Sequence, residues 1–98
     1  MRRDDALASL RSLETFLRGR GVSQIYLFGS VARDERAPGS TVGVAFDIAP
    51  GSDFDAFDQG GLYLDLVDAL GTRVNFIERR NLRTTSNIGV EVDLIRVF

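Results

Sequence analysis

The stretch LFGSVARDERAPGSTVGVAF, residues 27–46, decides the fold, because two short apolar runs flank a polar segment rich in turn formers. The first run belongs to SQIYLFGS at 23–30, a β-rich apolar pattern interrupted by glycine, so we expect a buried strand that ends in a turn at Gly29 and Ser30. TVGVAFDI at 41–48 predicts a second strand behind the polar loop. The stretch therefore predicts two strands joined by a hairpin-like connection.

The rest of the chain alternates between helical and extended patterns. In residues 4–21, leucines recur at helical spacing behind two aspartates, which favour a helix N-terminus, and Gly19 or Gly21 ends the run. TRVNFIE at 72–78 predicts a third strand. The tail at 84–98 fits a strand and a helix equally well, since its apolar residues match both periods. We therefore expect one α/β domain over residues 1–98.

Residues 52–70 predict a second helix that stops at Gly71, although Gly60 and Gly61 weaken the signal in its first half. We expect its apolar face to consist of Tyr63, Leu66, Val67 and Leu70. The aromatic residues of the strand runs are expected in the core, namely Tyr26, Phe28, Phe46 and Phe76. Three arginines near the third strand are expected to form a solvated cluster: Arg79, Arg80 and Arg83.

Composition excludes several kinds of chemistry. The chain has no cysteine and no histidine, which removes disulfides, thiolate nucleophiles and the commonest general base, and leaves carboxylates with hard cations as the ordinary metal chemistry. A formal charge of −2 argues against direct nucleic-acid binding. The N-terminal segment lacks the apolar core of a signal peptide, and no apolar run reaches membrane length. We expect a cytoplasmic protein without a membrane partner.

A known family is indicated by the Gly-Ser turn, the polar loop, the following strand and the later LGTRVNFI. Together they resemble the minimal nucleotidyltransferases of the DNA polymerase beta superfamily. These are small bacterial proteins often encoded beside a HEPN-type toxin. That family has a Gly-Ser turn, ten residues, an Asp-x-Asp pair on the next strand and a third Asp on a later strand. The matching positions are Gly29, Ser30, Ala32, Arg33, Glu35, Pro38 and Ser40. Asp34 stands where the family usually has glycine. The resemblance covers about residues 5–80 and implies the nucleotidyltransferase fold, an α/β (α+β) domain with a small mixed sheet and helices mainly on one face.

The three carboxylates of the family pattern are missing. After Ser30 and the ten intervening residues 31–40, the first carboxylate position falls on Thr41, the second falls on Gly43, and the third is Asn75. The family reaction transfers a nucleotide from a nucleoside triphosphate (NTP) to a hydroxyl group and uses two Mg²⁺ ions, which usually bind through carboxylates and substrate phosphates. In place of the three carboxylates, this sequence has the neutral hydroxyl of Thr41, no side chain at Gly43 and the neutral amide of Asn75. We therefore predict that no metal site and no intact catalytic site remain, and no cofactor is expected for this sequence.

The phosphate-binding part of the pattern is retained, and the resemblance assigns nucleotide binding to Gly29, Ser30, Arg33 and Ser40. Glycine at the start of a turn can present backbone N–H groups to a phosphate. We expect an antitoxin-like subunit whose partner is a HEPN-type toxin or a second copy of the chain. Two alternatives remain open: a nucleotide-binding sensor, and an active nucleotidyltransferase whose metal ligands are displaced.

Other aspartates imitate a metal site. Asp53 and Asp55 follow Ser52, a pattern typical of a helix N-terminus in which the serine hydroxyl caps a backbone N–H group. Asp47 shares a strand face with positions 41 and 43 but lies about 13 Å from position 43, at roughly 3.3 Å per residue. Asp93 in VDLI comes too late in the chain, so we expect it to be a surface residue.

Overall fold

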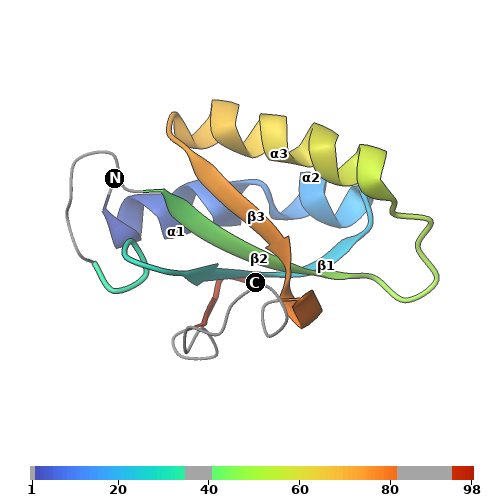
Figure 1. The fold of residues 1–98 in the computed structure, drawn as a ribbon, viewed down its shortest axis with the longest axis horizontal. Coiled ribbons are helices and arrows are strands. Elements are labelled where there is room, and N and C mark those ends of the chain that lie inside the picture. The colour runs from blue at the N-terminus through green and yellow to red at the C-terminus, as the bar shows by residue number, and fades with distance from the viewer. Residues whose placement is uncertain (1, 35–40, 82–93) are drawn as a thin grey trace.

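The computed structural model describes residues 2–34, 41–81 and 94–98, and Figure 1 shows their arrangement. The helices are α1 (Arg3–Ser12), α2 (Glu14–Gly19), α3 (Ala56–Leu70) and the short 3₁₀ helix η1 (Arg79–Asn81). The strands are β1 (Val22–Phe28), β2 (Val42–Ile48), β3 (Val74–Glu78) and β4 (Ile95–Arg96). In these residues no helix is both long enough and apolar enough to cross a bilayer.

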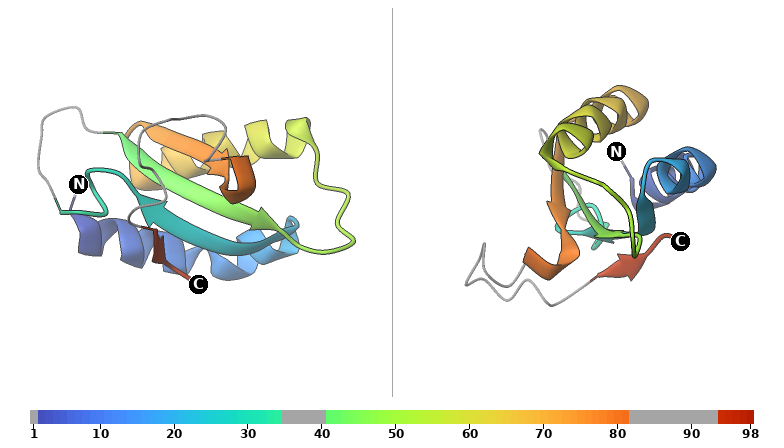
Figure 2. Two further views of the ribbon diagram at one scale, coloured as in Figure 1. Left: turned by 60° about the horizontal axis from the view of Figure 1, so that its bottom comes forward. Right: turned by 90° about the vertical axis from the view of Figure 1, so that its right-hand side faces the viewer.

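The strands form one mixed sheet in the order β3-β2-β1-β4. β1 pairs antiparallel with β2 and with β4, whereas β2 and β3 run parallel. The parallel pair is possible because α3 carries the chain back between the two strands. The α-helices lie on one face of the sheet (Figure 2). The predicted small mixed sheet with helices on one face is thus confirmed.

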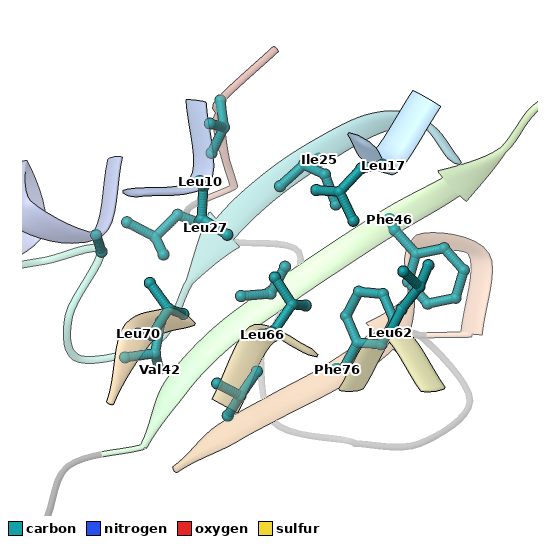
Figure 3. Close-up of a cluster of buried hydrophobic side chains, with 14 of the residues drawn as sticks. Leu10, Leu17, Ile25, Leu27, Val42, Phe46, Leu62, Leu66, Leu70 and Phe76 are labelled. Carbon is teal, nitrogen blue, oxygen red and sulfur yellow. The ribbon is translucent and has the colours of Figure 1, made fainter. Parts of the chain in front are cut away.

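The core lies between this sheet face and the helices (Figure 3). Alternation along β2 points Val42, Val44 and Phe46 toward the helices, and all three are fully buried. The ring of Phe46 stacks on that of Phe76 with centroids 4.3 Å apart. Offset stacking of this kind adds about 0.5–1.5 kcal/mol to the burial of the two rings. The core therefore fixes which face of β2 and β3 is turned away from the helices.

The first predicted helix is interrupted. α1 ends at Ser12, the backbone N–H of Leu13 donates to the Leu10 carbonyl oxygen at 3.1 Å, and α2 begins at Glu14. Both segments still bury leucines on the same side, since Leu10 and Leu17 are fully buried. The chain then enters β1 at Gly21, whose φ of 101° lies in the region that favours glycine.

The N-terminus of α3 differs from the prediction, because Asp55 caps it in place of Ser52. The Asp55 carboxylate accepts from the backbone N–H of Asp58 at 3.0 Å, and the Asp58 carboxylate accepts from that of Asp55 at 3.0 Å. This reciprocal capping box satisfies two backbone donors at once. Ser52 instead accepts from the backbone N–H of Phe54 at 3.2 Å, inside the preceding loop. A reciprocal pair satisfies more donors than one serine, and the helix starts later for that reason.

The apolar face of α3 also differs from the expected one. Its buried stripe is Leu62, Leu66 and Leu70, at a spacing of four residues, whereas Tyr63 is 39% exposed. Because 3.6 residues complete a turn, Leu62 and Tyr63 lie 100° apart, and only one can face the sheet centrally. Leu66 and Leu70 were predicted correctly.

Two of the four aromatic residues expected in the core lie elsewhere. Phe46 and Phe76 are buried, but Tyr26 and Phe28 are only half-buried. Ile25 and Leu27 take the inward positions of β1, so alternation turns the two aromatic rings to the opposite face. In the tail, residues 95 and 96 form a strand, while Arg83, Asp93 and the remainder of 84–93 lie outside the described residues.

Candidate functional site

The turn after β1 follows the glycine signal in the sequence. Gly29 has a φ of 83°, and the backbone N–H of Arg33 donates to the Gly29 carbonyl oxygen at 3.2 Å. Val31 and Ala32 are 2% exposed and fasten the turn to the core. Residues 30–34 form successive turns, in agreement with the turn predicted at Gly29 and Ser30. The turn is thus held by its own backbone hydrogen bonds and by the burial of Val31 and Ala32.

The backbone conformation at position 34 is one that suits glycine, although this chain has Asp34 there. Its φ is 59°, in the left-handed region that few residues other than glycine adopt readily. Aspartate is one of the tolerated exceptions, because its short polar side chain can bond locally. Here the Asp34 carboxylate accepts from the backbone N–H of Arg3 at 3.2 Å. The bond joins the turn to the N-terminus of α1.

The strand register brings two of the three pattern positions together. Gly43 pairs with Asn75 across the parallel β2–β3 ladder and with Phe28 across the antiparallel β1–β2 ladder. Thr41 immediately precedes β2, and both Thr41 and Asn75 are exposed. The three positions therefore lie at the start of β2 and β3, on the sheet face turned away from the helices.

Gly43 has no room for a side chain. A first side-chain carbon at this position would lie 2.6 Å from the carbonyl oxygen of Phe28 and 2.8 Å from its ring carbons Cδ2 and Cε2. Favourable contact between carbon atoms needs about 3.5–4.0 Å. The aromatic ring turned away from the core thus occupies the space that a carboxylate at position 43 would need.

The residues at these positions do not fit a magnesium ion. Thr41 and Asn75 offer only neutral oxygens, and Gly43 offers no side chain, whereas Mg²⁺ in proteins is held by one or two carboxylates and substrate phosphates. Among residues 2–34, 41–81 and 94–98 there is no group of three acidic side chains that could hold a metal ion. Of the residues assigned to nucleotide binding, Gly29 and Ser30 form the turn, Arg33 is exposed beside it, and Ser40 lies outside the described residues.

No protein-family model and no curated protein matches this sequence. Among solved structures, the chain matches a protein assigned as a minimal nucleotidyltransferase with a TM-score of 0.75 and 25% identity, over 97% of this chain and 95% of that one. The fold is that of a minimal nucleotidyltransferase.

Two toxin–antitoxin structures share the minimal nucleotidyltransferase fold. One contains AMP-PNP and matches with a TM-score of 0.69 and 21% identity, over 92% of this chain and 72% of that one. The other is a tri-AMPylated HEPN toxin from Shewanella oneidensis in complex with its MNT antitoxin, with a TM-score of 0.65 and 19% identity, over 95% of this chain and 71% of that one. At these identities the likeness concerns the fold.

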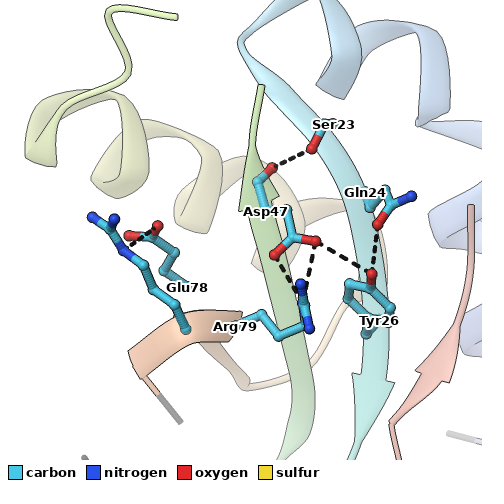
Figure 4. A network of polar contacts seen from close by, with 7 residues as sticks. Ser23, Gln24, Tyr26, Asp47, Glu78 and Arg79 are labelled. Carbon is cyan, nitrogen blue, oxygen red and sulfur yellow. Dashed lines mark hydrogen bonds and ion pairs between the residues drawn. The ribbon is translucent and has the colours of Figure 1, made fainter. Parts of the chain in front are cut away.

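Asp47, one of the aspartates that could imitate a metal site, belongs to a polar network on the same sheet face (Figure 4). Its carboxylate accepts from Arg79 Nε at 2.9 Å and from the Tyr26 hydroxyl at 3.2 Å, and that hydroxyl also contacts the Gln24 amide at 2.5 Å. This network was not predicted from the sequence, because Tyr26 was expected in the core. Strict alternation from Ile25 and Leu27 is the signal that identifies it.

The network changes the electrostatics of its own members. Burial raises the pKa of Tyr26 above its ordinary value, the Asp47 charge raises it further, and the Arg79 charge acts in the opposite direction. The hydrogen bond to Asp47 raises the pKa of Arg79. The Arg79 side chain is 47% exposed, and exposed ion pairs contribute little to stability. The network is therefore a surface feature of this domain and contributes little to its stability.

An open pocket of about 530 Å³ lies beside this network, at the end of β2 away from Gly43. Asp47, Ser52, Phe54, Glu78 and Arg79 contribute to its wall. Its arginines are engaged with carboxylates, since Arg80 Nε also lies 2.7 Å from Glu78. The pocket is thus separate from the three pattern positions, and its charges are largely paired with one another.

Proposed function

We propose that this chain is an antitoxin-like member of the minimal nucleotidyltransferase family that has kept the scaffold and lost the reaction. Its function is then to bind a protein partner of the HEPN type in the cytoplasm. The fold supports the family, and toxin–antitoxin complexes among the similar structures support a protein partner. The formal charge of −2 supports a protein partner over a nucleic acid.

The observation that carries this proposal is the packing of Phe28 against Gly43. The family reaction needs a carboxylate at this position, yet a first side-chain carbon there would come within 2.6 Å of the Phe28 carbonyl oxygen. Asn75, beside it in the register, has no charge with which to accept a proton from an attacking hydroxyl. Loss of a single electrostatic stabiliser typically costs about 10²–10³-fold in rate. Without all three carboxylates at one site, we expect no useful rate of nucleotide transfer.

Radiolabelled ATP with Mg²⁺ or Mn²⁺ tests the proposal, with a HEPN-type protein as the acceptor. We expect the two proteins to form a complex and no label to reach the partner. Label on the partner that disappears in Ser30→Ala would refute the loss of the reaction. Absence of any complex would refute the role as a binding subunit.

A second arm asks whether the site can be rebuilt. The triple variant Thr41→Asp, Gly43→Asp and Asn75→Asp supplies the missing carboxylates but still meets the Phe28 ring. Adding Phe28→Ala removes the ring, so we expect this quadruple variant to bind Mn²⁺ at least about tenfold more tightly than the triple one by calorimetry. Equal Mn²⁺ affinity in the two folded variants would show that the ring does not close the site.

The retained turn supports a second candidate function, a nucleotide sensor. Gly29 keeps its positive φ, and the exposed Arg33 lies beside it, so backbone N–H groups and a guanidinium remain near the place of a phosphate. Calorimetry with ATP distinguishes the candidates. Binding that is equal with and without Mg²⁺ would favour the sensor, whereas no binding would favour a subunit that only contacts its partner.

A further inference from the structure

The outer surface of α3 exposes two large apolar side chains. Phe57 is 90% exposed and Leu64 is 65% exposed, while the opposite face of the helix is buried through Leu62 and Leu66. Seven residues separate Phe57 from Leu64, which is nearly two helical turns and about 10 Å along the axis. The two side chains therefore project from the same side of α3, away from the core.

Two glycines lie between these side chains. A first side-chain carbon at Gly60 or at Gly61 would meet no heavy atom within 4 Å, so nothing in the described fold requires glycine there. Glycine is nevertheless among the least favourable residues in a helix interior. Glycine in an exposed helix allows another backbone to approach closely. The helix surface between Phe57 and Leu64 therefore carries no side chains at Gly60 and Gly61.

The charges of the segment that contains α3 have one sign. Residues 53–72 contain five aspartates and no arginine or lysine, whereas the other residues of the chain carry twelve arginines and nine acidic residues. Three of the aspartates, at positions 58, 65 and 68, lie on α3 itself. A protein that covers this helix must supply positive charge, because unlike charges across an interface direct association and like charges oppose it.

A second copy of the chain does not suit this surface. Two α3 helices in symmetrical contact would bring their aspartates together. Contact between α3 and the arginines of α1 and α2 on another copy would be heterologous, and such contacts form open chains unless the rotation closes. The occupant that fits is therefore a different protein with a positive surface.

We propose that the outer face of α3, formed by Phe57, Gly60, Gly61 and Leu64, is the docking surface for a partner protein that presents a basic amphipathic helix. The apolar ridge of that helix lies over the two glycines, between the apolar side chains of α3. Its lysines or arginines face the aspartates of α3. The inference rests on the proposed binding function, and it places the interface on the helix layer and not at Gly43.

The first test uses a fluorescein-labelled, 20-residue amphipathic peptide with leucine on one face and lysine and arginine beside it. A control peptide replaces every basic residue with glutamate. We expect the basic peptide to bind at least about tenfold more tightly in anisotropy titrations, with an affinity that falls as salt screens the charges. No binding of the basic peptide, or equal affinity for the two peptides, would overturn the proposal.

Variants of the protein locate the surface. Phe57→Ser should weaken peptide binding about tenfold, whereas the matched change Phe16→Ser on α2, at a side chain 42% exposed, should leave it unchanged. Gly61→Ala separates binding from stability, because the melting temperature should rise by about 4–8 °C while peptide affinity falls about tenfold. Unchanged affinity in Phe57→Ser or in Gly61→Ala would refute this surface.

The same variants against the HEPN-type protein separate this inference from the proposed function. Undiminished complex formation by Phe57→Ser would refute the α3 surface and leave the binding function intact. If the parent chain forms no complex, the binding function itself fails, whatever the peptide result.

Discussion

Gly43→Ala is the smallest change that tests the closed state of the candidate site. The added carbon would lie 2.6 Å from the Phe28 carbonyl oxygen, which belongs to the backbone of the neighbouring strand, and 2.8 Å from the Phe28 ring. A ring can rotate away, but the carbonyl oxygen moves only if β1 and β2 separate locally. Overpacking of this kind costs about 1–3 kcal/mol, and the lower chain entropy of alanine returns about 0.5–1 kcal/mol. We expect a net loss of about 1–2 kcal/mol.

Thermal and urea unfolding followed by circular dichroism measures this loss, which corresponds to a fall in melting temperature of roughly 5–15 °C for a domain of this size. Gly60→Ala is the matched control, because its added carbon meets nothing within 4 Å and the change should raise stability. Phe28→Ala in both backgrounds isolates the part of the loss that is due to the ring. A Gly43→Ala protein as stable as the parent would refute the packing argument.

The capping box and the polar network give further predictions. Asp55→Ala should lower the free energy of unfolding by about 1 kcal/mol, and Asp53→Ala by less than about 0.5 kcal/mol; equal losses in chemical denaturation would contradict the assignment of the cap. Burial and then Asp47 raise the pKa of Tyr26, so its stabilising contribution is present below pH of about 10 and is lost as pH rises through the folded-state pKa. Asp47→Asn should lower that pKa, as phenolate absorbance in a Tyr63→Phe background would show; an unchanged titration would exclude the carboxylate as a cause.

Local signals in the sequence were enough to predict most elements. The strands around Gly29 and the end of α3 at Gly71 were predicted correctly, because glycine and apolar periodicity act within a few residues. The interruption at Leu13 and the cap at Asp55 were missed. Both depend on which of several backbone hydrogen bonds forms, and neighbouring residue types leave that choice open.

The candidate site was only partly predicted from the sequence. Counting from Ser30 identified positions 41, 43 and 75 as neutral, and the register places Gly43 beside Asn75. The packing of Phe28 against Gly43 could not be predicted, because the sequence analysis placed that ring in the core. Whether a ring folds inward or outward on a strand depends on its neighbours across the sheet, and these become known only with the register.

The contact between Phe28 and Gly43 also restricts which substitutions position 43 can accept. In a chain that has both residues, a single substitution to aspartate at position 43 gives an overpacked and less stable protein, with no metal site to compensate. Proteins sit only slightly above the stability they need, so such intermediates are readily removed by selection. Both the Phe28 ring and the Phe28 carbonyl oxygen must move before position 43 can hold a carboxylate. Which residues position 43 can accept therefore depends on an earlier change in the neighbouring strand β1.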